Sequence, residues 1–328
     1  MLRIITILTL ALLMGCPPPK QDDGVKPPPP TNGGTTRYQD LRKHSYSEKG
    51  EDVDPELSAD GKTLYFATSS NSLTFDIYEK ATDGTTVRQI TSDPSNERFP
   101  KICPTNPATI AFSSDRDGGY ATFYIKDFNK EPSKWVKISE NNSYDLHPAW
   151  SSDGTKITYC STADFGEEWV IKIYDLTTNA RYKLPIDGIL PEWSPVKGDN
   201  RIVFQRMKHR DNWFSEIWLI TFDGKEAKSP TKIVASSDWA AINPAWSQDG
   251  KYITFATVGK SKTRKGVFNE ADDIWTVQAD GGGLTQITTD DSADWMPTWA
   301  TDGRIYFISK RLGAQNIWSL KPSIPTTK

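Results

Sequence analysis

Hydrophobic and polar positions alternate along this chain in short runs, and one such phrase returns six times. Each copy holds a proline, then a tryptophan or another apolar residue, then a turn and a run that ends on an aromatic residue. The six prolines lie 43 to 53 residues apart and are Pro55, Pro100, Pro148, Pro191, Pro244 and Pro297. A period of this length indicates a solenoid, a propeller or an array, because one unit cannot bury its apolar face alone.

Each repeat predicts four short antiparallel strands. The first carries a tryptophan in four repeats, and an Asp-Gly turn such as Asp153-Gly154 leads into the second. Asp-Gly supplies the positive φ angles that a tight hairpin needs. A third strand with an Ile-Tyr or Ile-Trp pattern and a short fourth strand complete the unit. Four antiparallel strands in about 45 residues are typical of a propeller blade, so we predict an all-β, six-bladed β-propeller.

The two ends of the repeat region predict how the ring closes. Only eight residues follow Leu320 in the sixth repeat, and Pro322 and Pro325 are poor members of a central strand. The sixth blade therefore lacks an outer strand, whereas residues 37–43 precede the first repeat without a partner. Pairing the two removes two exposed sheet edges. We predict a propeller of residues 37–321, closed by an N-terminal strand, with residues 322–328 as a tail.

The repeats resemble those of the TolB family, which are built around P-x-W-S-x-D-G-x-x-I-x-F. The copies from His147 (HPAWSSDGTKITY) and Asn243 (NPAWSQDGKYITF) match this pattern, and SSDRDGG from Ser113 matches the same family. The resemblance covers residues 37–321 and implies a six-bladed propeller that docks proteins in the cell envelope. WD40-type repeats are a poorer match, because their G-H and W-D signatures are absent. The namesake of the family carries an α/β domain before its propeller, and a different segment takes that place here.

The N-terminal residues predict a lipoprotein signal peptide at 1–15. Arg3 precedes an apolar run from Ile4 to Met14, which is too short to span a bilayer. The run ends in Leu-Met-Gly-Cys16, which resembles a bacterial lipobox and implies cleavage before Cys16 and attachment of fatty acid (palmitate) to it. An ordinary secretory signal is the alternative. Because Pro17 follows the cysteine, the family's sorting rule implies the periplasmic side of the outer membrane.

Residues 16–36 predict a tether between this anchor and the propeller. They read CPPPKQDDGVKPPPPTNGGTT, and proline runs favour an extended polyproline II chain that cannot build a core. The formal net charge of −3 gives no reason to expect a nucleic acid partner. We expect a monomer that binds an envelope protein or peptide.

Acidic residues stand three positions before four of the six prolines. They are Asp52, Glu97, Asp145 and Asp294. Blade connections lie on one face of a propeller, so we predict four carboxylates around one mouth of the central channel. They could hold a divalent cation such as calcium or a basic ligand, because hard cations favour clustered oxygens. The alternative is that each carboxylate caps backbone N–H groups of its own turn or bridges to the next blade. No other cofactor is expected.

The same face carries the two longest loops, which begin at Gln205 and Thr257. Basic residues mix with aromatic ones there, as in Arg210, Trp213 and Phe214. Loops on a rigid scaffold concentrate binding residues, and arginine beside exposed aromatic rings is typical of interface anchors. We predict a recognition surface at these loops. Trp239 and Trp295 lie near the blade connections on this face and serve either binding or the core.

Catalytic motifs are weak in this sequence. The three histidines are not spaced as a metal pair, and no G-x-S-x-G, H-E-x-x-H or phosphate-loop motif is present. His147 lies just before a repeat proline and near Asp145, as a structural residue or as part of an enzyme site. The sequence favours a non-enzymatic, lipid-anchored binding or scaffold protein. The alternative is a channel-mouth glycan lyase, hydrolase or peptidase that uses histidine and carboxylates from several blades.

Overall fold

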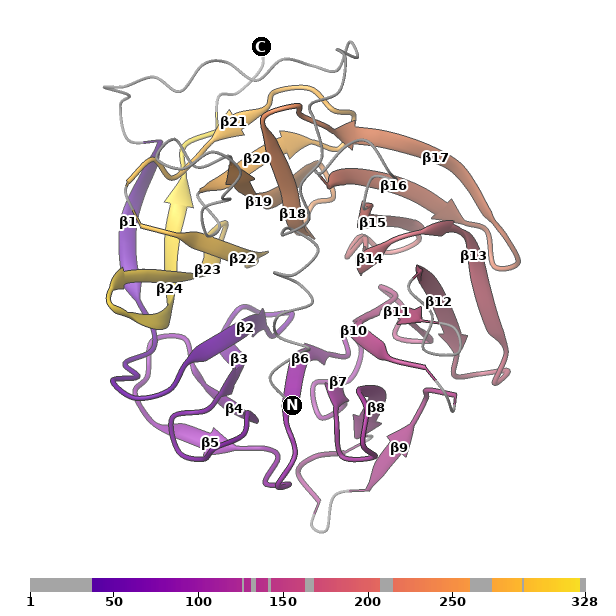
Figure 1. The fold of residues 1–328 in the computed structure, drawn as a ribbon, viewed down its shortest axis with the longest axis horizontal. Coiled ribbons are helices and arrows are strands. Elements are labelled where there is room, and N and C mark those ends of the chain that lie inside the picture. Colours follow the sequence, from indigo (N-terminus) through magenta and orange to yellow (C-terminus); the bar gives the residue numbers. More distant parts are fainter. Residues whose placement is uncertain are drawn as a thin grey trace.

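Six four-stranded antiparallel sheets radiate from a central axis like the blades of a propeller (Figure 1). The computed structural model describes residues 37–125, 127–130, 134–140, 143–162, 168–206, 215–259, 273–290 and 292–324. The prediction of an all-β, six-bladed propeller is confirmed. These residues contain no helix that is long and apolar enough to cross a membrane.

Every blade uses the same four strand positions, counted outward from the axis. The innermost strands are β2 (Asp52–Leu57), β6 (Glu97–Ile102), β10 (Asp145–Trp150), β14 (Ile189–Trp193), β18 (Trp239–Trp246) and β22 (Asp294–Trp299). The second strands are β3 (Thr63–Thr68), β7 (Ile110–Ser114), β11 (Lys156–Thr162), β15 (Arg201–Arg206), β19 (Tyr252–Gly259) and β23 (Ile305–Leu312). The third strands are β4 (Asp76–Ala81), β8 (Ala121–Ile125), β12 (Trp169–Asp175), β16 (Glu216–Phe222), β20 (Ile274–Gln278) and β24 (Ala314–Pro322). The outer strands are β5 (Val87–Gln89), β9 (Trp135–Lys137), β13 (Arg181–Asp187), β17 (Ala227–Val234), β21 (Thr285–Gln286) and β1 (Tyr38–Lys43).

Successive strands of a blade run in opposite directions, which gives the disc two distinct faces. The turn face carries the turns between first and second strands. The connection face carries the blade-to-blade connections and the loops between second and third strands. A side chain near the start of an innermost strand therefore lies toward the connection face, and one near its end lies toward the turn face.

The N-terminal strand closes the ring as the sequence predicts. β1 pairs antiparallel with β24 and becomes the outer strand of blade six (Figure 1). Arg304, with a side chain only 3% exposed, forms an ion pair with Asp40 of β1 at 2.7 Å and donates to Ser319 Oγ at 2.8 Å. β24 continues through Pro322, whose Cα faces that of Tyr38 across the pair. The β1–β24 strand pairing and the buried guanidinium of Arg304 therefore join the two ends of the propeller.

The residue before each repeat proline has a positive φ angle, although none of the six is glycine. Their φ values lie between 50° and 56°, and they are Asp54, Phe99, His147, Leu190, Asn243 and Met296. The pairing of first and second strands shifts register at the same place in every blade. Bulges of this kind bend a strand and re-aim a side chain. The same bulge therefore sets the direction of all six side chains.

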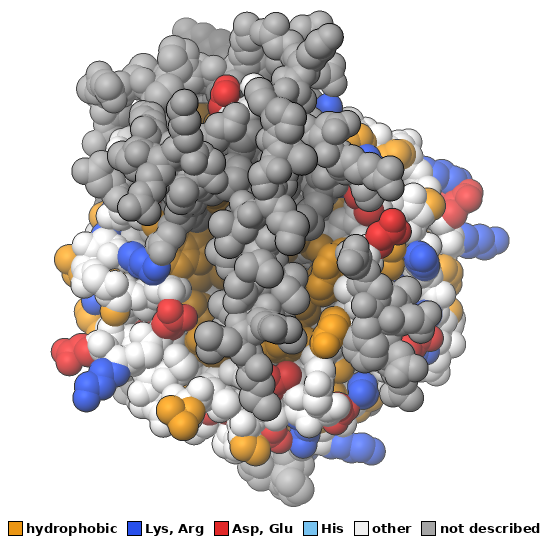
Figure 2. Space-filling view, in the orientation of Figure 1, with side chains coloured by type: hydrophobic (Ala, Val, Ile, Leu, Met, Phe, Trp, Pro, Cys, Tyr) orange, Lys and Arg blue, Asp and Glu red, His pale blue; other side chains and the backbone are white. Residues whose placement is uncertain are grey.

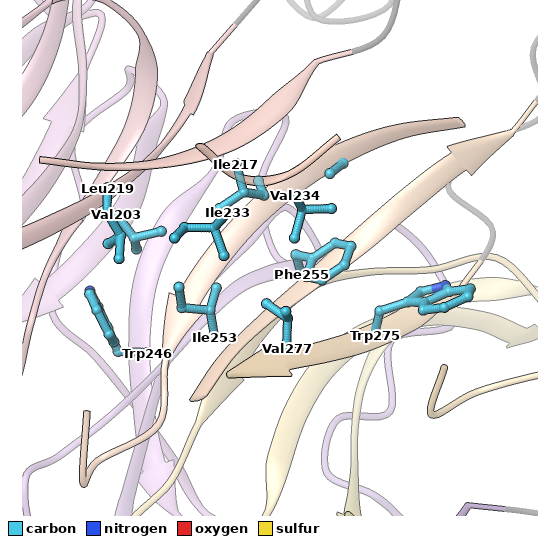
Figure 3. Close-up of a cluster of buried hydrophobic side chains, with 11 residues drawn as sticks. Val203, Ile217, Leu219, Ile233, Val234, Trp246, Ile253, Phe255, Trp275 and Val277 are labelled. Atoms are coloured by element: carbon cyan, nitrogen blue, oxygen red, sulfur yellow. The ribbon is translucent and has the colours of Figure 1, made fainter. Parts of the chain in front are cut away.

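Apolar side chains fill the spaces between neighbouring blades. In the cluster of Figure 3, residues of blade four such as Val203 and Ile217 face residues of blade five such as Trp246 and Phe255. The indole Nε1 of Trp246 donates to the backbone oxygen of Glu192 in blade four at 3.1 Å. The repeat tryptophan therefore packs against the preceding blade and also bonds to its backbone.

Candidate binding site in the central channel

The central channel is lined by two layers of side chains that the repeat proline separates. The channel ring, toward the connection face, consists of the six positive-φ residues Asp54, Phe99, His147, Leu190, Asn243 and Met296. A layer nearer the turn face follows the prolines and includes Glu56, Lys101, Glu192 and Thr298. The channel ring encloses a cavity of about 70 Å³ and the deeper layer one of about 130 Å³. Figure 2 shows hydrophobic side chains bordering the middle of the disc.

Half of the channel ring is apolar and half is polar. Phe99, Leu190 and Met296 are half-buried. Asp54 is held by Arg98, whose Nε and Nη2 donate to its two carboxylate oxygens at 2.5 and 3.1 Å. The guanidinium of Arg98 also lies 4.9 Å from the centre of the Phe99 ring. A bidentate pair of this kind fixes both side chains. Asp54 is therefore a rigid, charged member of a ring in which polar and apolar residues alternate from blade to blade.

Three charged side chains meet below the channel ring. Lys101 Nζ lies 3.1 Å from Glu56 Oε2 and 2.5 Å from Glu192 Oε1, which joins blades two, one and four across the channel. Burial raises the pKa of Glu56 to about 7 and also raises the pKa of Glu192, although Lys101 opposes both shifts. Burial alone would lower the pKa of Lys101, but the two carboxylates raise it above its ordinary value. The lysine therefore stays charged and cross-links three blades.

His147 is the one histidine of the channel ring, and its side chain is 6% exposed. Its ring centre lies 3.9 Å from that of Phe99, and Nδ1 lies 3.4 Å from Cys160 Sγ. Nε2 has no hydrogen-bond partner among the described residues. Burial, followed by the positive charges of Arg98 and Lys101, lowers the pKa of His147 to about 3. The imidazole is therefore neutral at physiological pH.

The depressed pKa of His147 makes stability depend on pH. The unfolded state takes up a proton near the ordinary pKa of 6.5 and the folded state only near 3, so stability is lost as the pH falls through this window. Between pH 7 and pH 5 we expect the wild type to lose about 2 kcal/mol more than His147→Asn. Asn243 occupies the same backbone position in blade five, so asparagine fits there. Urea denaturation at both pH values tests this, and equal losses in the two proteins would refute it.

The four carboxylates that the sequence places around the channel mouth do not line the channel cavity. Asp52, Glu97, Asp145 and Asp294 are 0–5% exposed at the starts of their strands. Glu97 accepts from Ser114 Oγ at 2.8 Å, and Asp294 pairs with Arg311 at 2.7 Å. Burial raises the pKa of Glu97 to about 8 and that of Asp294 to about 6.

Glu97 and Asp294 bind side chains of their own blades, rather than the backbone of their own turns or the next blade. Asp145 differs, because neither of its oxygens has a hydrogen-bond partner among the described residues. Asp52 faces a separate cleft, described below. In the part of the chain that the structure describes, no three His, Cys, Asp or Glu side chains are grouped to hold a metal ion. The divalent cation considered for the channel mouth therefore has no such site there.

The sequence and the structure were compared with those of known proteins. No family model matches the sequence. An uncharacterized protein of Agrobacterium fabrum is 31% identical over 108 residues, which are 33% of this chain and 32% of that protein. The chain thus matches about a third of this relative's length.

Solved structures match over far more of the chain. A TolB protein of Agrobacterium tumefaciens has a TM-score of 0.59 and 20% identity over 82% of this chain and 90% of that one. TolB from Acinetobacter baumannii has a TM-score of 0.57 and 15% identity, over 81% and 65% of the two chains. The chain has a TolB-like propeller fold. An oligogalacturonate lyase of Vibrio parahaemolyticus also matches, with a TM-score of 0.56 and 13% identity over 86% and 93%.

The two tryptophans predicted on the connection face pack against the core of the TolB-like propeller. Trp239 lies at the start of β18 and its ring centre is 5.6 Å from that of Trp275. Trp295 is half-buried beside two apolar clusters, with Lys310 Nζ at 5.8 Å from its ring centre. Both have exposed fractions between those of core and surface residues, so they can border a docking surface without forming its centre.

Several predicted residues lie outside the described part of the TolB-like propeller. They are Cys16, Arg210, Trp213 and Phe214. Of the channel ring, only His147 was among the predicted residues, and the other five were missed. The signal for the ring is present, because each member directly precedes a repeat proline and the six positions carry six different residue types. A position that varies within an otherwise repeated phrase indicates a role that differs from blade to blade.

Proposed function

We propose that this TolB-like propeller is a lipid-anchored protein of the cell envelope that binds a protein or peptide partner on its connection face and acts as a scaffold. The channel ring carries this proposal. Six equivalent backbone positions present Phe99, Leu190 and Met296 beside three polar residues, around a small cavity. Binding sites typically combine a largely apolar lining with a few fixed polar groups.

The partner chemistry follows from the side chains of the ring. Apolar groups of the partner are proposed to pack on Leu190 and Met296. Its polar groups are proposed to bond to Asn243, which stands between these two residues, and to the Asp54–Arg98 pair. Arg210, Trp213 and Phe214, which the sequence predicts on this face from their place in the repeat, are proposed to extend the surface. Asp52, Glu97, Asp145 and Asp294 lie at the starts of the inner strands, toward the same face. Attachment through Cys16 to the periplasmic side of the outer membrane rests on the lipobox resemblance.

A channel enzyme is the second candidate function. The unpartnered Nε2 of His147 favours it, because this buried atom belongs to a channel-lining side chain. The oligogalacturonate lyase shows that a similar propeller serves carbohydrate chemistry in another protein. Against it, a histidine with a pKa of about 3 is a weak proton acceptor, and general acid–base catalysis favours a pKa near the working pH.

Partner capture tests the proposed function. The full-length protein carries an affinity tag, and envelope proteins bound to it are identified after cross-linking. Leu190→Arg places a charge at an apolar position of the ring, and Trp213→Ala with Phe214→Ala removes two candidate anchors. Loss of an interface anchor commonly costs about 2 kcal/mol, or roughly thirtyfold in affinity, so capture should fall strongly in both variants. Lys62→Ala on the turn face is the control and should capture as the wild type does.

Three further results decide between the candidates. Cys16→Ser should release the protein from the membrane fraction while leaving capture by the propeller intact. Undiminished capture by Leu190→Arg, with an unchanged melting temperature, would remove the partner from the channel ring. If the purified protein turns over a glycan or a peptide and His147→Ala stops this without unfolding it, the enzyme reading replaces the scaffold.

A further inference from the structure

A second cavity lies at the seam where the ring closes, and it shares no lining residue with the channel cavities. This seam cleft measures about 230 Å³. Residues 44–47, which follow β1, form one side, and Phe66, Tyr78 and Lys80 of blade one form the other. Pockets for drug-sized molecules span roughly 300–1,000 Å³, so this volume suits a smaller molecule.

Lys80 is a buried cation without a counter-charge in contact. Lys80 is 7% exposed. Its Nζ donates one hydrogen bond, to the backbone oxygen of His44 at 2.7 Å. Among the described residues no carboxylate lies within 4.0 Å of it. Burial lowers the pKa of Lys80, which Asp52 partly opposes. Since burying an unpaired ammonium is costly, the arrangement calls for an anionic group in the cleft.

Asp52 supplies the opposite charge in the same cleft without touching Lys80. It is 5% exposed, and the side-chain hydrogen bond it accepts from a described residue, Ser70 Oγ, is long at 3.4 Å. His44 adds no charge, because burial lowers its pKa to about 4. Its two ring nitrogens are already engaged, at 3.2 Å from Thr82 O and 2.7 Å from Ser319 Oγ. The cleft therefore presents one cation and one anion that do not neutralise each other directly.

Apolar surface completes the cleft between these two charges. Phe66 and Tyr78 are 4% and 7% exposed and lie on the face of blade one that looks toward blade six. Val87 of β5 and Tyr46 stand at the edge, where they are 48% and 66% exposed. Strand β4 thus places a lysine and an aromatic ring on the same side, two residues apart, as the pleat dictates.

We propose that the seam cleft binds a free α-amino acid with an apolar side chain. The carboxylate of the amino acid pairs with Lys80, its ammonium group pairs with Asp52, and its side chain packs on Phe66 and Tyr78. A simple carboxylate would leave Asp52 unpaired, and a simple amine would leave Lys80 unpaired. A small zwitterion is the chemistry that satisfies both buried charges at once.

Binding should tighten the ring, because the ligand would touch blade one and the segment that follows the closing strand. A ligand that binds only the folded state raises the melting temperature, by about 5 °C for a chain of this size at saturating concentration. Lys80 already fastens residue 44 to blade one, so a purely structural role for it predicts no ligand effect at all.

Calorimetric titration and thermal melts of the full-length protein test the proposal. The probes are L-valine, L-leucine, L-methionine and L-phenylalanine, each at concentrations up to the millimolar range. For leucine, 4-methylpentanoate lacks the ammonium group and isopentylamine lacks the carboxylate. We expect at least one of the amino acids to bind, and both analogues of leucine to bind roughly thirtyfold more weakly than leucine or worse, since each leaves one buried charge unpaired.

Two variants test the charged residues of the seam cleft one at a time. Lys80→Met retains the apolar stem and Asp52→Asn retains the shape, and each should abolish binding, while Lys62→Met on the turn face should bind as the wild type does. If Lys80→Met does not fold, Asp52→Asn alone decides. Absence of binding by all four amino acids, equal binding of 4-methylpentanoate and leucine, or unchanged binding by a folded Asp52→Asn protein would each overturn the proposal.

Discussion

Deleting residues 37–43 should lower the melting temperature of the propeller by 10 °C or more and convert it to oligomers. The deletion removes β1, exposes the edge of β24 and takes away Asp40, the carboxylate partner of Arg304. It also removes Tyr38 and Leu41, which pack against the apolar cluster of blade six, and typical domains have only about 5–15 kcal/mol of stability to lose. Exposed strand edges then pair with other chains. Thermal melts and size-exclusion chromatography measure both effects.

Deleting seven residues elsewhere is the matched control. Removal of residues 17–23 shortens the proline-rich tether by the same length and should leave the melting temperature unchanged, because these residues precede the closing strand. A protein that lacks residues 37–43 yet stays monomeric, with a wild-type melting temperature, would show that β1 contributes little to closure.

Lys101→Met should destabilise the folded protein by about 3–5 kcal/mol at pH 8, because Glu56 and Glu192 would face each other without their shared cation. The loss should shrink at pH 5. Burial already raises the pKa of Glu56 to about 7, so both carboxyls of the variant take up protons in the folded state as the pH falls, which removes their repulsion. Urea denaturation at the two pH values measures the difference.

Two comparisons separate this effect from a general loss of packing. Adding Glu56→Gln and Glu192→Gln to Lys101→Met should recover most of the stability at pH 8. Lys251→Met removes a lysine whose side chain is 74% exposed beside Asp249, and should cost less than about 1 kcal/mol. An equal loss for Lys101→Met at pH 5 and pH 8 would mean that the charges of this layer are not its essential feature.

The strand order within a blade could be predicted because the same pattern occurs in all six repeats. Ring closure could be predicted because the last repeat lacks a strand. Asp-Gly turns and the repeat prolines fix the ends of the inner strands, as in β10, which ends at Trp150. The count of strands in the last blade then requires a partner, and residues 37–43 are the available segment. These are local signals, so a single sequence is sufficient.

The residues that face the channel could not be predicted in the same way. In a regular strand, residues two apart share a face, which would align Asp145, His147 and Ala149. The positive φ at His147 breaks that alternation, so His147 lines the channel cavity while Asp145 is buried at the start of β10. The sequence motif does not predict this bulge, because non-glycine residues rarely adopt a positive φ angle.

Contacts between residues far apart in the sequence could not be predicted either. Lys101 meets Glu192 across the channel, and Arg304 meets Asp40 at a separation of 264 residues. Such pairs follow from the closed ring and from side-chain lengths together. The seam cleft is of the same kind, since Lys80 and His44 become neighbours only after the ring has closed.

The seam also sets how the disc would bear mechanical load. The chain enters the propeller through β1, whose first residue, Tyr38, lies at the turn face and at the outer rim. Tension on residue 37 directed away from the rim peels β1 from β24 one rung at a time, beginning opposite Pro322. Tension along the strand instead loads all the rungs together. Asp40 lies two residues from Tyr38, where peeling starts, and is held by Arg304, so this ion pair is among the first contacts that such tension would break.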